Sequence, residues 1–339
     1  GLVIFLEGGG ACLNEDFCDF NPANIDSTLA GDGATVLGGT LGTIRSRQQP
    51  GVYSDITQLG LPAGIHDFSD PQNPFQAWSH VYVPYCTGDL HFGAQLEGEV
   101  PNLEPQRFAG YFNMQRFIAR IVPTFKNRVS RVVLTGSSAG AFGALLNFSM
   151  VQDAFGSVPI ELIADSGFFL GDEYMPACLQ KRLRERWGFH TSLPSDCTAC
   201  AGRDGGDLIA LTEFVLTKHP AARIALLSGT QDEMIRLVLS AGLKDCAGYE
   251  DADPVAITAR QVFEPEVLFS AQEFSEGLDD VRARYRSTGR VATYFLGAPV
   301  ANVHHLLIRA GASTEMAGGL TPAQFVRDFL AGRTEHFGP

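Results

Sequence analysis

The sequence predicts an α/β fold, in which a mostly parallel sheet is covered by helices on both faces. Short apolar segments of strand length alternate with helical patterns along the chain, and this alternation is typical of parallel sheets with crossover helices. The predicted strands are continuously apolar, as strands buried on both faces require. The chain has 339 residues, of which 45% are hydrophobic and 19% charged, so it can bury a large core.

The predicted elements follow one another in regular order. The strands are Leu2–Leu6, Val81–Tyr85, Arg131–Thr135, Ile160–Ala164, Arg223–Leu227 and Val291–Leu296. The helices are Asn113–Phe125, Ala139–Gln152, Gln180–Trp187, Asp207–Lys218 and Asp279–Ser287. We therefore interpret residues 1–339 as a single domain. Because a buried strand seldom opens a domain, we expect further strands of the sheet, and any signal peptide, before Gly1.

Two insertions interrupt the alternation. Residues 19–72 are rich in Gly, Asp, Ser and Pro, and predict a long, partly ordered excursion. Residues 171–203 combine a basic helix with a Cys-x-x-Cys loop. One interpretation of this second insertion is a lid over a substrate site. The alternative is a solvated helix with a loop closed by a disulfide.

The stretch from Arg131 to Asn147, RVVLTGSSAGAFGALLN, carries the strongest chemical signal. A β-branched run leads into a Gly-Ser-Ser-Ala-Gly pentapeptide at positions 136–140, and small and apolar residues follow. This order predicts a strand, a tight turn and a helix. A Gly-x-Ser-x-Gly turn projects its serine Oγ from the edge of the sheet, so Ser138 is the candidate nucleophile. A Gly/Ser-rich turn without chemistry is the alternative.

An acid and a histidine follow later predicted strands. Asp232 lies just past the strand 223–227, and His304 lies past the strand 291–296. Serine, acid and histidine in this order are typical of the α/β-hydrolase fold, and catalytic groups gather at the carboxyl ends of parallel strands. In such a site the serine attacks a carbonyl carbon, the histidine moves its proton and the carboxylate orients the histidine.

Each of these positions has a rival. Asp165 also follows a predicted strand, Glu233 adjoins Asp232, and His305 adjoins His304. An aspartate after a strand is often a helix N-cap or a turn former. The residues alone therefore leave the identity of the acid and of the base open.

Three glycines, Gly8, Gly9 and Gly10, directly follow the first predicted strand. Acyl transfer needs backbone N–H donors aimed at the developing oxyanion, and glycines let a loop approach closely enough to supply them. The N–H of Ala139, directly after the candidate nucleophile, is the second expected donor. A flexible turn is the alternative interpretation of the glycines.

Net charge limits the partners. The formal charge is −13, which repels polyanions, so we expect no nucleic-acid partner. Apolar runs such as Leu2–Leu6 have strand length, well short of the roughly 20 residues of a membrane span. We therefore expect no membrane span.

Seven cysteines indicate the redox environment. Cys12 and Cys18 flank a polar loop, and Cys197 and Cys200 lie in a Pro/Ser/Asp-rich segment. Both pairs predict disulfides, and hence an oxidising compartment. Zinc at the Cys-x-x-Cys would need two further ligands, and a redox site would open a helix after a strand. Because the count is odd, at least one cysteine is free or pairs outside the chain.

Together these stretches resemble the pectin acetylesterase family, which includes the Notum carboxylesterases. The matching stretches are Leu6–Cys12, Pro84–Asp89, Gly136–Gly140, Asp165–Leu170, Gln231–Glu233 and Ala298–Arg309. Ala11 stands where the family has a tryptophan, and Ala301 stands where many members have a cysteine. The resemblance implies a secreted serine esterase with an α/β-hydrolase fold and no cofactor or metal.

The resemblance also implies roles for individual residues. It places the triad acid at Asp232 rather than Asp165, and the base at His304 rather than His305. It assigns the oxyanion donors to Gly9, Gly10 and Ala139.

The expected partner is an ester substrate, and we expect a monomer. The first hypothesis is a pectin acetylesterase-like deacetylase of O-acetylated polysaccharide. An acidic chain would meet a polyuronate only through a local cationic cluster, for which Arg182, Arg184 and Arg186 are the candidates.

Two further hypotheses remain. One is a carboxylesterase, lipase-type or polyester-type hydrolase of apolar acyl esters, a Notum-like deacylase. Its acyl slot would be lined by phenylalanines in or near the motifs, although such residues are more often core. The candidates are Phe112, Phe117, Phe142, Phe168 and Phe169. The other hypothesis is a non-catalytic binding protein on a hydrolase scaffold.

Overall fold

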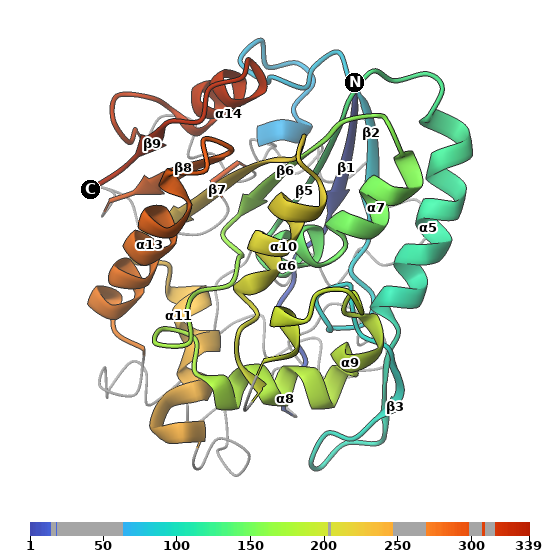
Figure 1. Cartoon of the computed structure of the whole chain (residues 1–339), viewed down its shortest axis with the longest axis vertical. Helices are drawn as coiled ribbons and strands as arrows, with labels where there is room; N and C mark the ends of the chain where they lie inside the picture. The colour runs from blue at the N-terminus through green and yellow to red at the C-terminus, as the bar shows by residue number, and fades with distance from the viewer. Residues whose placement is uncertain (15–17, 19–63, 203–204, 247–268, 298–306, 309–315) are drawn as a thin grey trace.

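The computed structural model describes residues 1–14, 18, 64–202, 205–246, 269–297, 307–308 and 316–339 (Figure 1). Within these residues, seven strands form one parallel sheet in the order β2-β1-β5-β6-β7-β8-β9. They are β1 Leu2–Leu6, β2 Ser79–Val83, β5 Val132–Ser137, β6 Ile160–Asp165, β7 Arg223–Gly229, β8 Val291–Leu296 and β9 His336–Phe337. A separate antiparallel pair consists of β3 Gln95–Gly98 and β4 Gln106–Phe108.

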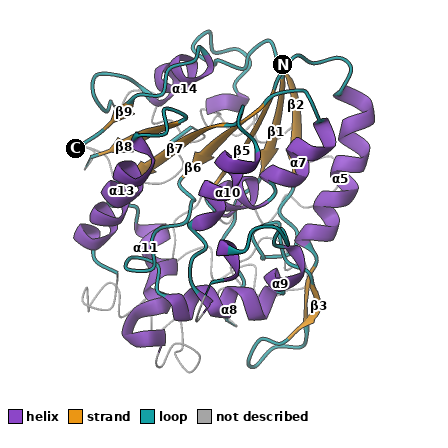
Figure 2. Cartoon of the chain, viewed as in Figure 1, coloured by secondary structure: helices purple, strands orange, loops and turns teal. Residues whose placement is uncertain are grey.

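Helices cover both faces of this sheet (Figure 2). On one face lie α5 Gly110–Phe125, α6 Ala139–Leu146, α7 Phe148–Phe155, α10 Ala210–Lys218 and α13 Ala271–Arg286. On the other lie α14 Pro322–Leu330 and the short 3-10 helix η2 Gly64–His66. The remaining helices are α8 Ala177–Trp187, α9 Phe189–Ser192, η3 Ala199–Ala201, α11 Glu233–Leu239 and η5 Ser240–Cys246.

The strand sequences explain this layering. Side chains alternate across a strand, so in β1 Leu2 and Ile4 join the core on one face, while Val3 and Phe5 join the core on the other. All of β1, β5, β6 and β8 is buried. The predicted α/β fold with helices on both faces is therefore confirmed.

The predicted helix 139–152 is wrong in one respect, because it is two helices, α6 and α7, that meet at Asn147. The side-chain Nδ2 of Asn147 donates hydrogen bonds to the carbonyls of Gly143 and His91. An asparagine side chain that bonds to nearby backbone competes with the helical ladder. The break thus has a local cause, and it ties α6 to the loop that contains His91.

Of the two predicted insertions, only the second lies almost entirely within the described residues. Most of 19–72 lies outside them. The insertion 171–203 contains α8, α9 and η3, and Figure 1 shows α8 and α9 beyond the carboxyl ends of the strands. The indole Nε1 of Trp187 donates to the carbonyl of Cys12 at 3.0 Å. The insertion is therefore fastened to the loop that leaves β1.

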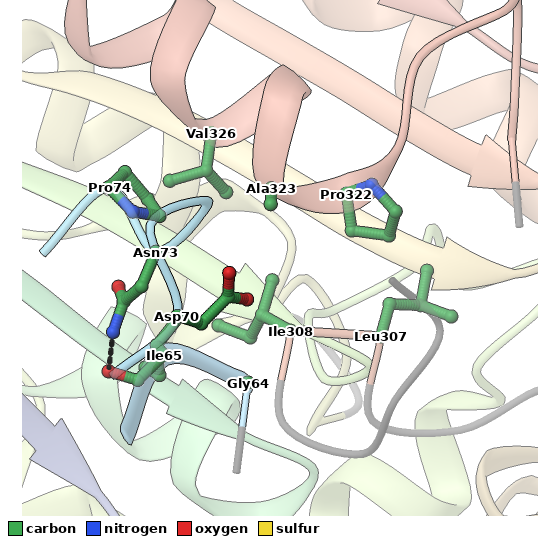
Figure 3. A pocket seen from close by; sticks show the side chains of 10 residues that line it. All are labelled: Gly64, Ile65, Asp70, Asn73, Pro74, Leu307, Ile308, Pro322, Ala323 and Val326. Atoms are coloured by element: carbon green, nitrogen blue, oxygen red, sulfur yellow. Dashed lines mark hydrogen bonds between the residues drawn. The ribbon is translucent and has the colours of Figure 1, made fainter. Parts of the chain in front are cut away.

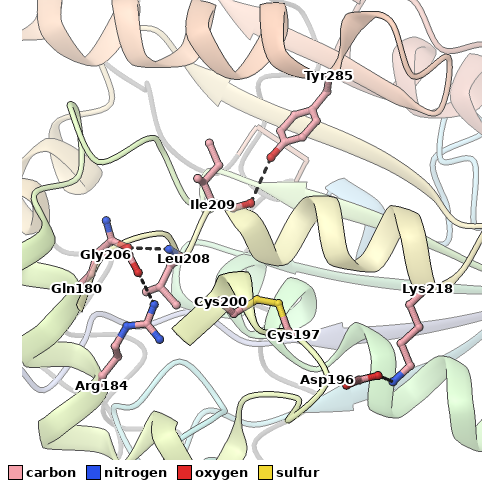
Figure 4. The surroundings of a disulfide bond; sticks show 10 residues. All are labelled: Gln180, Arg184, Asp196, Cys197, Cys200, Gly206, Leu208, Ile209, Lys218 and Tyr285. Carbon is pink, nitrogen blue, oxygen red and sulfur yellow. Dashed lines mark hydrogen bonds and ion pairs between the residues drawn. A yellow bond between two sulfur atoms is a disulfide. The ribbon is translucent and has the colours of Figure 1, made fainter. Parts of the chain in front are cut away.

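Polar contacts hold this insertion from its inner side (Figure 4). The guanidinium of Arg184 donates to the carbonyls of Gly205 and Gly206, and the side-chain oxygen of Gln180 accepts from the N–H of Leu208. Arg182 donates to the carbonyl of Cys246. Two of the three basic side chains considered for a polyuronate are thus engaged with backbone carbonyls.

Three disulfides lie within the described residues. Cys12–Cys18 and Cys197–Cys200 confirm the two predicted pairs. The third, Cys178–Cys246, joins α8 to η5 across 68 residues and was not predicted. Cys86 carries a free thiol. None of the helices described above is both long enough and apolar enough to span a bilayer.

Candidate active site

Ser138 occupies the sharp turn between β5 and α6. Its backbone has φ 56° and ψ −126°, a conformation that a residue with a side chain adopts only under strain. Its N–H donates to the carbonyl of Asp165 at 2.8 Å, which continues the sheet past β5. Strained backbone of this kind is typical of a nucleophile turn that presents a serine Oγ at the sheet edge. Ser138 is half-buried.

Glycines make this turn sterically possible. A Cβ on Gly140 would collide with the carbonyl of Leu6, and a Cβ on Gly136 would collide with that of Gly140. A Cβ on Gly8 would lie 3.0 Å from the Cβ of Ser138 and would overlap the carbonyl of Ser137. The glycine loop after β1 therefore packs directly against the serine turn, as the predicted oxyanion site requires.

The loop after β1 is fixed at both ends. The carboxylate of Glu7 accepts from the N–H of Tyr85, and its carbonyl lies 2.8 Å from the Nε2 of His91. The N–H of Cys12 donates to the carbonyl of Gly88 at 2.7 Å. Fixed donors stabilise a developing charge better than mobile ones. Gly9 and Gly10 lie between these anchors, and Gly10 has φ 84°, which favours glycine.

Ala139 is the first residue of α6 and is 4% exposed. The first N–H groups of an α-helix have no partner within the helix, and the positive end of the helix dipole favours a negative charge there. The N–H of Ala139 thus belongs to the part of the molecule where an oxyanion beside Ser138 would be stabilised.

Asp165 ends β6, next to β5, and is fully buried. Its carboxylate accepts hydrogen bonds from the Oγ of Ser137 at 3.0 Å, and from the N–H groups of Leu307 at 2.8 Å and Ile308 at 3.0 Å. The Oγ of Ser166 also donates to it. Asp165 therefore joins the nucleophile strand to the segment that follows β8.

Asp232 lies three residues past β7 and is also fully buried. It is the N-cap of α11, and its Oδ1 accepts from the N–H groups of Met234 and Ile235. Glu233 is the first residue of that helix. His304 and His305 lie outside the described residues. The structure thus places Asp232 just past the carboxyl end of β7, the strand next to β6. Its partnership with His304 stays a prediction.

The phenylalanines considered for an acyl slot pack mainly in the core. Phe142 and Phe168 are 9% and 6% exposed, and Phe169 is 1% exposed. The rings of Phe142 and Phe169 lie 5.2 Å apart, and that of Phe168 stacks on Phe295. Phe112 is only half-buried. These contacts are those of core residues beside the serine turn.

A cavity of about 40 Å³ lies between η2 and α14 (Figure 3). It is bordered by Gly64, Ile65, Asp70, Asn73, Pro74, Leu307, Ile308, Pro322, Ala323 and Val326. This volume suits a few water molecules rather than an acyl chain. Ser138, Asp232 and the glycine loop do not border it, whereas Leu307 and Ile308, the two residues held by Asp165, do.

The sequence alone does not reveal the contacts of two residues beside the site. His91 contacts the glycine loop, but its motif match ended at Asp89, two positions earlier. By sequence Asp165 is a rival for the triad acid, whereas in the fold it holds Leu307 and Ile308 from 142 and 143 residues away. No cluster of three His, Cys, Asp or Glu side chains suited to a metal occurs in the described part of the chain.

A parallel sheet with a strained serine turn between a central strand and a helix is the architecture of an α/β hydrolase. The solved structure of the Wnt deacylase Notum from Drosophila has the same fold, with a TM-score of 0.60 and 18% identity over 98% of this chain and 85% of that one.

The family is also shown by sequence. A pectinacetylesterase family model matches residues 1–202, and the chain belongs to this family. Two curated relatives are palmitoleoyl-protein carboxylesterases. Notum of Drosophila melanogaster is 32% identical over 150 residues, covering 40% of this chain and 22% of the relative. Human Notum is 26% identical over 178 residues, covering 50% of this chain and 31% of the relative. The matches thus span less than a third of the length of these relatives.

Proposed function

We propose that the chain is a serine carboxylic ester hydrolase with the triad Ser138, Asp232 and His304. The observation that carries the proposal is the strained backbone of Ser138 on the turn between β5 and α6, with the glycine loop packed against it. Membership of the pectinacetylesterase family supports the same reaction.

In the proposed mechanism, the Oγ of Ser138 attacks the ester carbonyl while the imidazole of His304 accepts its proton. The carboxylate of Asp232 orients the imidazole and stabilises its charged form. The oxyanion binds to backbone N–H groups on the two sides of Ser138. Collapse of the intermediate expels the alcohol, which takes the proton from His304, and water then releases the acid by the same steps. The proposed oxyanion donors are Gly9, Gly10 and Ala139.

The substrate has two candidates. The first is an acetyl ester on a polysaccharide, as the name of the family suggests. Because Arg182 and Arg184 are engaged with backbone carbonyls, a neutral acetylated polysaccharide fits better than a polyuronate. The second is an apolar acyl ester, supported by relatives named palmitoleoyl-protein carboxylesterases.

We further propose that the protein acts as a monomer in an oxidising compartment outside the cytoplasm. Three disulfides support the compartment, because such bonds persist mainly in secreted and periplasmic proteins.

Labelling with a fluorophosphonate tests the chemistry. We expect stoichiometric modification of Ser138 and loss of p-nitrophenyl ester hydrolysis, with Ser138→Ala folded and about 10⁴-fold or more below wild type in kcat. His304→Ala should be far more damaging than His305→Ala, which serves as its matched control. Hydrolysis at full rate by Ser138→Ala contradicts the nucleophile, and an unlabelled wild type indicates a binding protein.

A substrate panel separates the two candidates. Wild-type protein is assayed on p-nitrophenyl esters from acetate to decanoate, on acetylated xylan and on acetylated pectin. Preference for acetate together with release of acetate from xylan supports the polysaccharide deacetylase. A maximum of kcat/KM at long acyl chains supports the deacylase of apolar esters.

A further inference from the structure

His91 is a buried histidine that takes no part in the proposed triad or among the proposed oxyanion donors. It lies between β2 and β3 and is 4% exposed. Both Leu90 and His91 have φ 57°, the left-handed region that residues with side chains seldom adopt. Two consecutive strained residues persist only where the surroundings hold them, and such strain gathers at functional sites.

Specific contacts hold this strained loop. The N–H of Leu90 donates to the hydroxyl of Tyr85 at 2.9 Å. The buried carboxylate of Asp89 accepts from the hydroxyl of Thr87 at 2.7 Å and from the N–H of Gly110 at 2.8 Å. The ring of Tyr85 lies against that of His91, with 4.7 Å between centroids. The loop is therefore built to present the imidazole in one orientation.

The imidazole is presented to the loop after β1. Its Nε2 lies 2.8 Å from the carbonyl oxygen of Glu7. Because a carbonyl only accepts, this Nε2 carries the hydrogen. Burial lowers the pKa of His91 to about 4, so the ring is neutral at neutral pH and donates through Nε2. Glu7 directly precedes Gly8, the glycine that packs against Ser137 and Ser138.

The same residue also contacts the helix that follows the nucleophile. The carbonyl of His91 accepts from the Nδ2 of Asn147 at 3.0 Å. A Cβ on Gly143 of α6 would lie 3.0 to 3.1 Å from ring and Cβ atoms of His91, so the histidine packs closely against this helix. His91 thus touches the two elements that carry the proposed oxyanion donors.

We propose that His91 is a positioning residue that sets the spacing between the two halves of the oxyanion site, the glycine loop 8–10 and the start of α6. This inference rests on the proposed function. The hydrogen bond to Glu7 holds the start of the glycine loop against His91. The contacts with Gly143 and Asn147 hold His91 against α6, so together they set the distance between the loop and the helix. Loss of the bond lets the loop relax, so its N–H groups no longer point at the oxyanion.

Substitution of His91 tests this role. His91→Phe keeps an aromatic ring but removes the donor, whereas His91→Gln keeps an N–H donor of similar reach. We expect His91→Phe to lower kcat for p-nitrophenyl acetate by about 10- to 100-fold per active site, with KM within about threefold, because misplaced donors weaken only the transition state. His91→Gln should recover most of this loss. Fluorophosphonate labelling counts the active sites.

A transition-state probe separates positioning from folding. A trifluoromethyl ketone forms a tetrahedral adduct with an active serine, so its affinity should fall by the same factor as kcat in His91→Phe. If His91→Phe does not fold, Asn147→Ala should show a smaller loss of about three- to tenfold in the same direction. His219→Phe, which removes a histidine bond to Ser149 of α7, is the control and should keep wild-type kcat.

The outcomes are distinct. Equal kcat per labelled site in wild type, His91→Phe and His91→Gln overturns the inference, because a purely structural histidine would change only the fraction of folded protein. A wild type that neither hydrolyses esters nor is labelled at Ser138 overturns the proposed function itself.

Discussion

Two buried aspartates at the ends of neighbouring parallel strands have different surroundings. Asp165 ends β6 and Asp232 follows β7, and both are fully buried. The carboxylate of Asp165 accepts from a serine of β5 and from two N–H groups after β8. Asp232 accepts instead from two N–H groups of its own helix, α11. Residue type, burial and location near the carboxyl end of a strand are the same, so none of these decides the role.

The partners distinguish the two positions. Asp165 joins three segments that are distant in sequence, and its contacts are those of a residue that fixes backbone in place. Asp232 forms a local N-cap, which turns its carboxyl group toward the start of α11 at the carboxyl edge of the sheet. We propose a structural role for Asp165 and the catalytic role for Asp232, the acid that the family resemblance implies, and the two positions predict opposite mutant behaviour.

The largest effect is expected at Asp232. Asp232→Asn should lower kcat for p-nitrophenyl acetate by about 10³- to 10⁴-fold, because a neutral amide no longer stabilises the charged imidazole or selects its tautomer. Asparagine is as good an N-cap as aspartate, so the free energy of unfolding should stay within about 1 kcal/mol of wild type. Steady-state kinetics and urea unfolding measure the two quantities.

The neighbouring carboxylate is the control for Asp232. Glu233→Gln changes the next residue on the same helix by the same chemistry and should retain wild-type kcat within about threefold. If Glu233→Gln shows the large loss and Asp232→Asn does not, the acid is Glu233.

Asp165 should show the reverse pattern. In Asp165→Asn an amide group replaces one oxygen, and it then faces an N–H of Leu307 or Ile308 with no acceptor between them. Because buried donors are left unpaired, we expect a loss of about 4 kcal/mol in the free energy of unfolding. Per labelled active site, kcat should fall by only about tenfold, since Leu307 lies three residues after His304.

Ser137→Ala is the matched control for this prediction. It removes a single bond to the Asp165 carboxylate and should cost about 1–2 kcal/mol, with kcat unchanged. If Asp165→Asn lowered kcat by 10³-fold and left stability unchanged, Asp165 would be the triad acid and the comparison would be inverted.

The sequence predicted local features of the fold and site well. Apolar runs located the six predicted strands, and the Gly-x-Ser-x-Gly pentapeptide located the serine turn. Strand ends were predicted less accurately: β2 ends at Val83 rather than Tyr85, because Pro84 has no N–H to extend the ladder. Local patterns of this kind are set by neighbours in sequence, which is why they can be recognised in one chain.

Contacts between distant segments could not be predicted in this way. His91 reaches Glu7 from 84 residues away, and Cys178 pairs with Cys246 across 68. No periodicity or spacing specifies either partner, because both are set by how the strands and loops pack. A residue that supports the site from a distance therefore becomes visible only in the fold.

A third buried aspartate, Asp89, extends the comparison to pH. Burial raises the pKa of Asp89 to about 6 and lowers that of His91, two residues away, to about 4. Glu7, Tyr85 and Cys86 are the other titratable groups around this loop. Neither Asp89 nor His91 is favoured in its charged form, and the two consequences for stability have opposite signs.

The signs follow from proton binding. As pH rises from about 4 to 6, the folded state keeps the proton of Asp89 that the unfolded state has lost, so stability falls by about 3 kcal/mol. Over about the same range, the unfolded state loses a proton from His91 that the folded state never bound, so stability rises by about 3 kcal/mol. In the wild type, the two changes largely cancel.

Single substitutions should expose each slope. Relative to wild type, the free energy of unfolding of His91→Gln should decrease by about 3 kcal/mol between pH 4 and 6.5, because the contribution of Asp89 is no longer opposed. That of Asp89→Asn should increase by a similar amount. Urea unfolding at half-unit pH intervals measures both. Parallel pH profiles of the unfolding free energy for the three proteins would contradict this prediction. They would mean that neither Asp89 nor His91 has a different pKa in the folded and unfolded states.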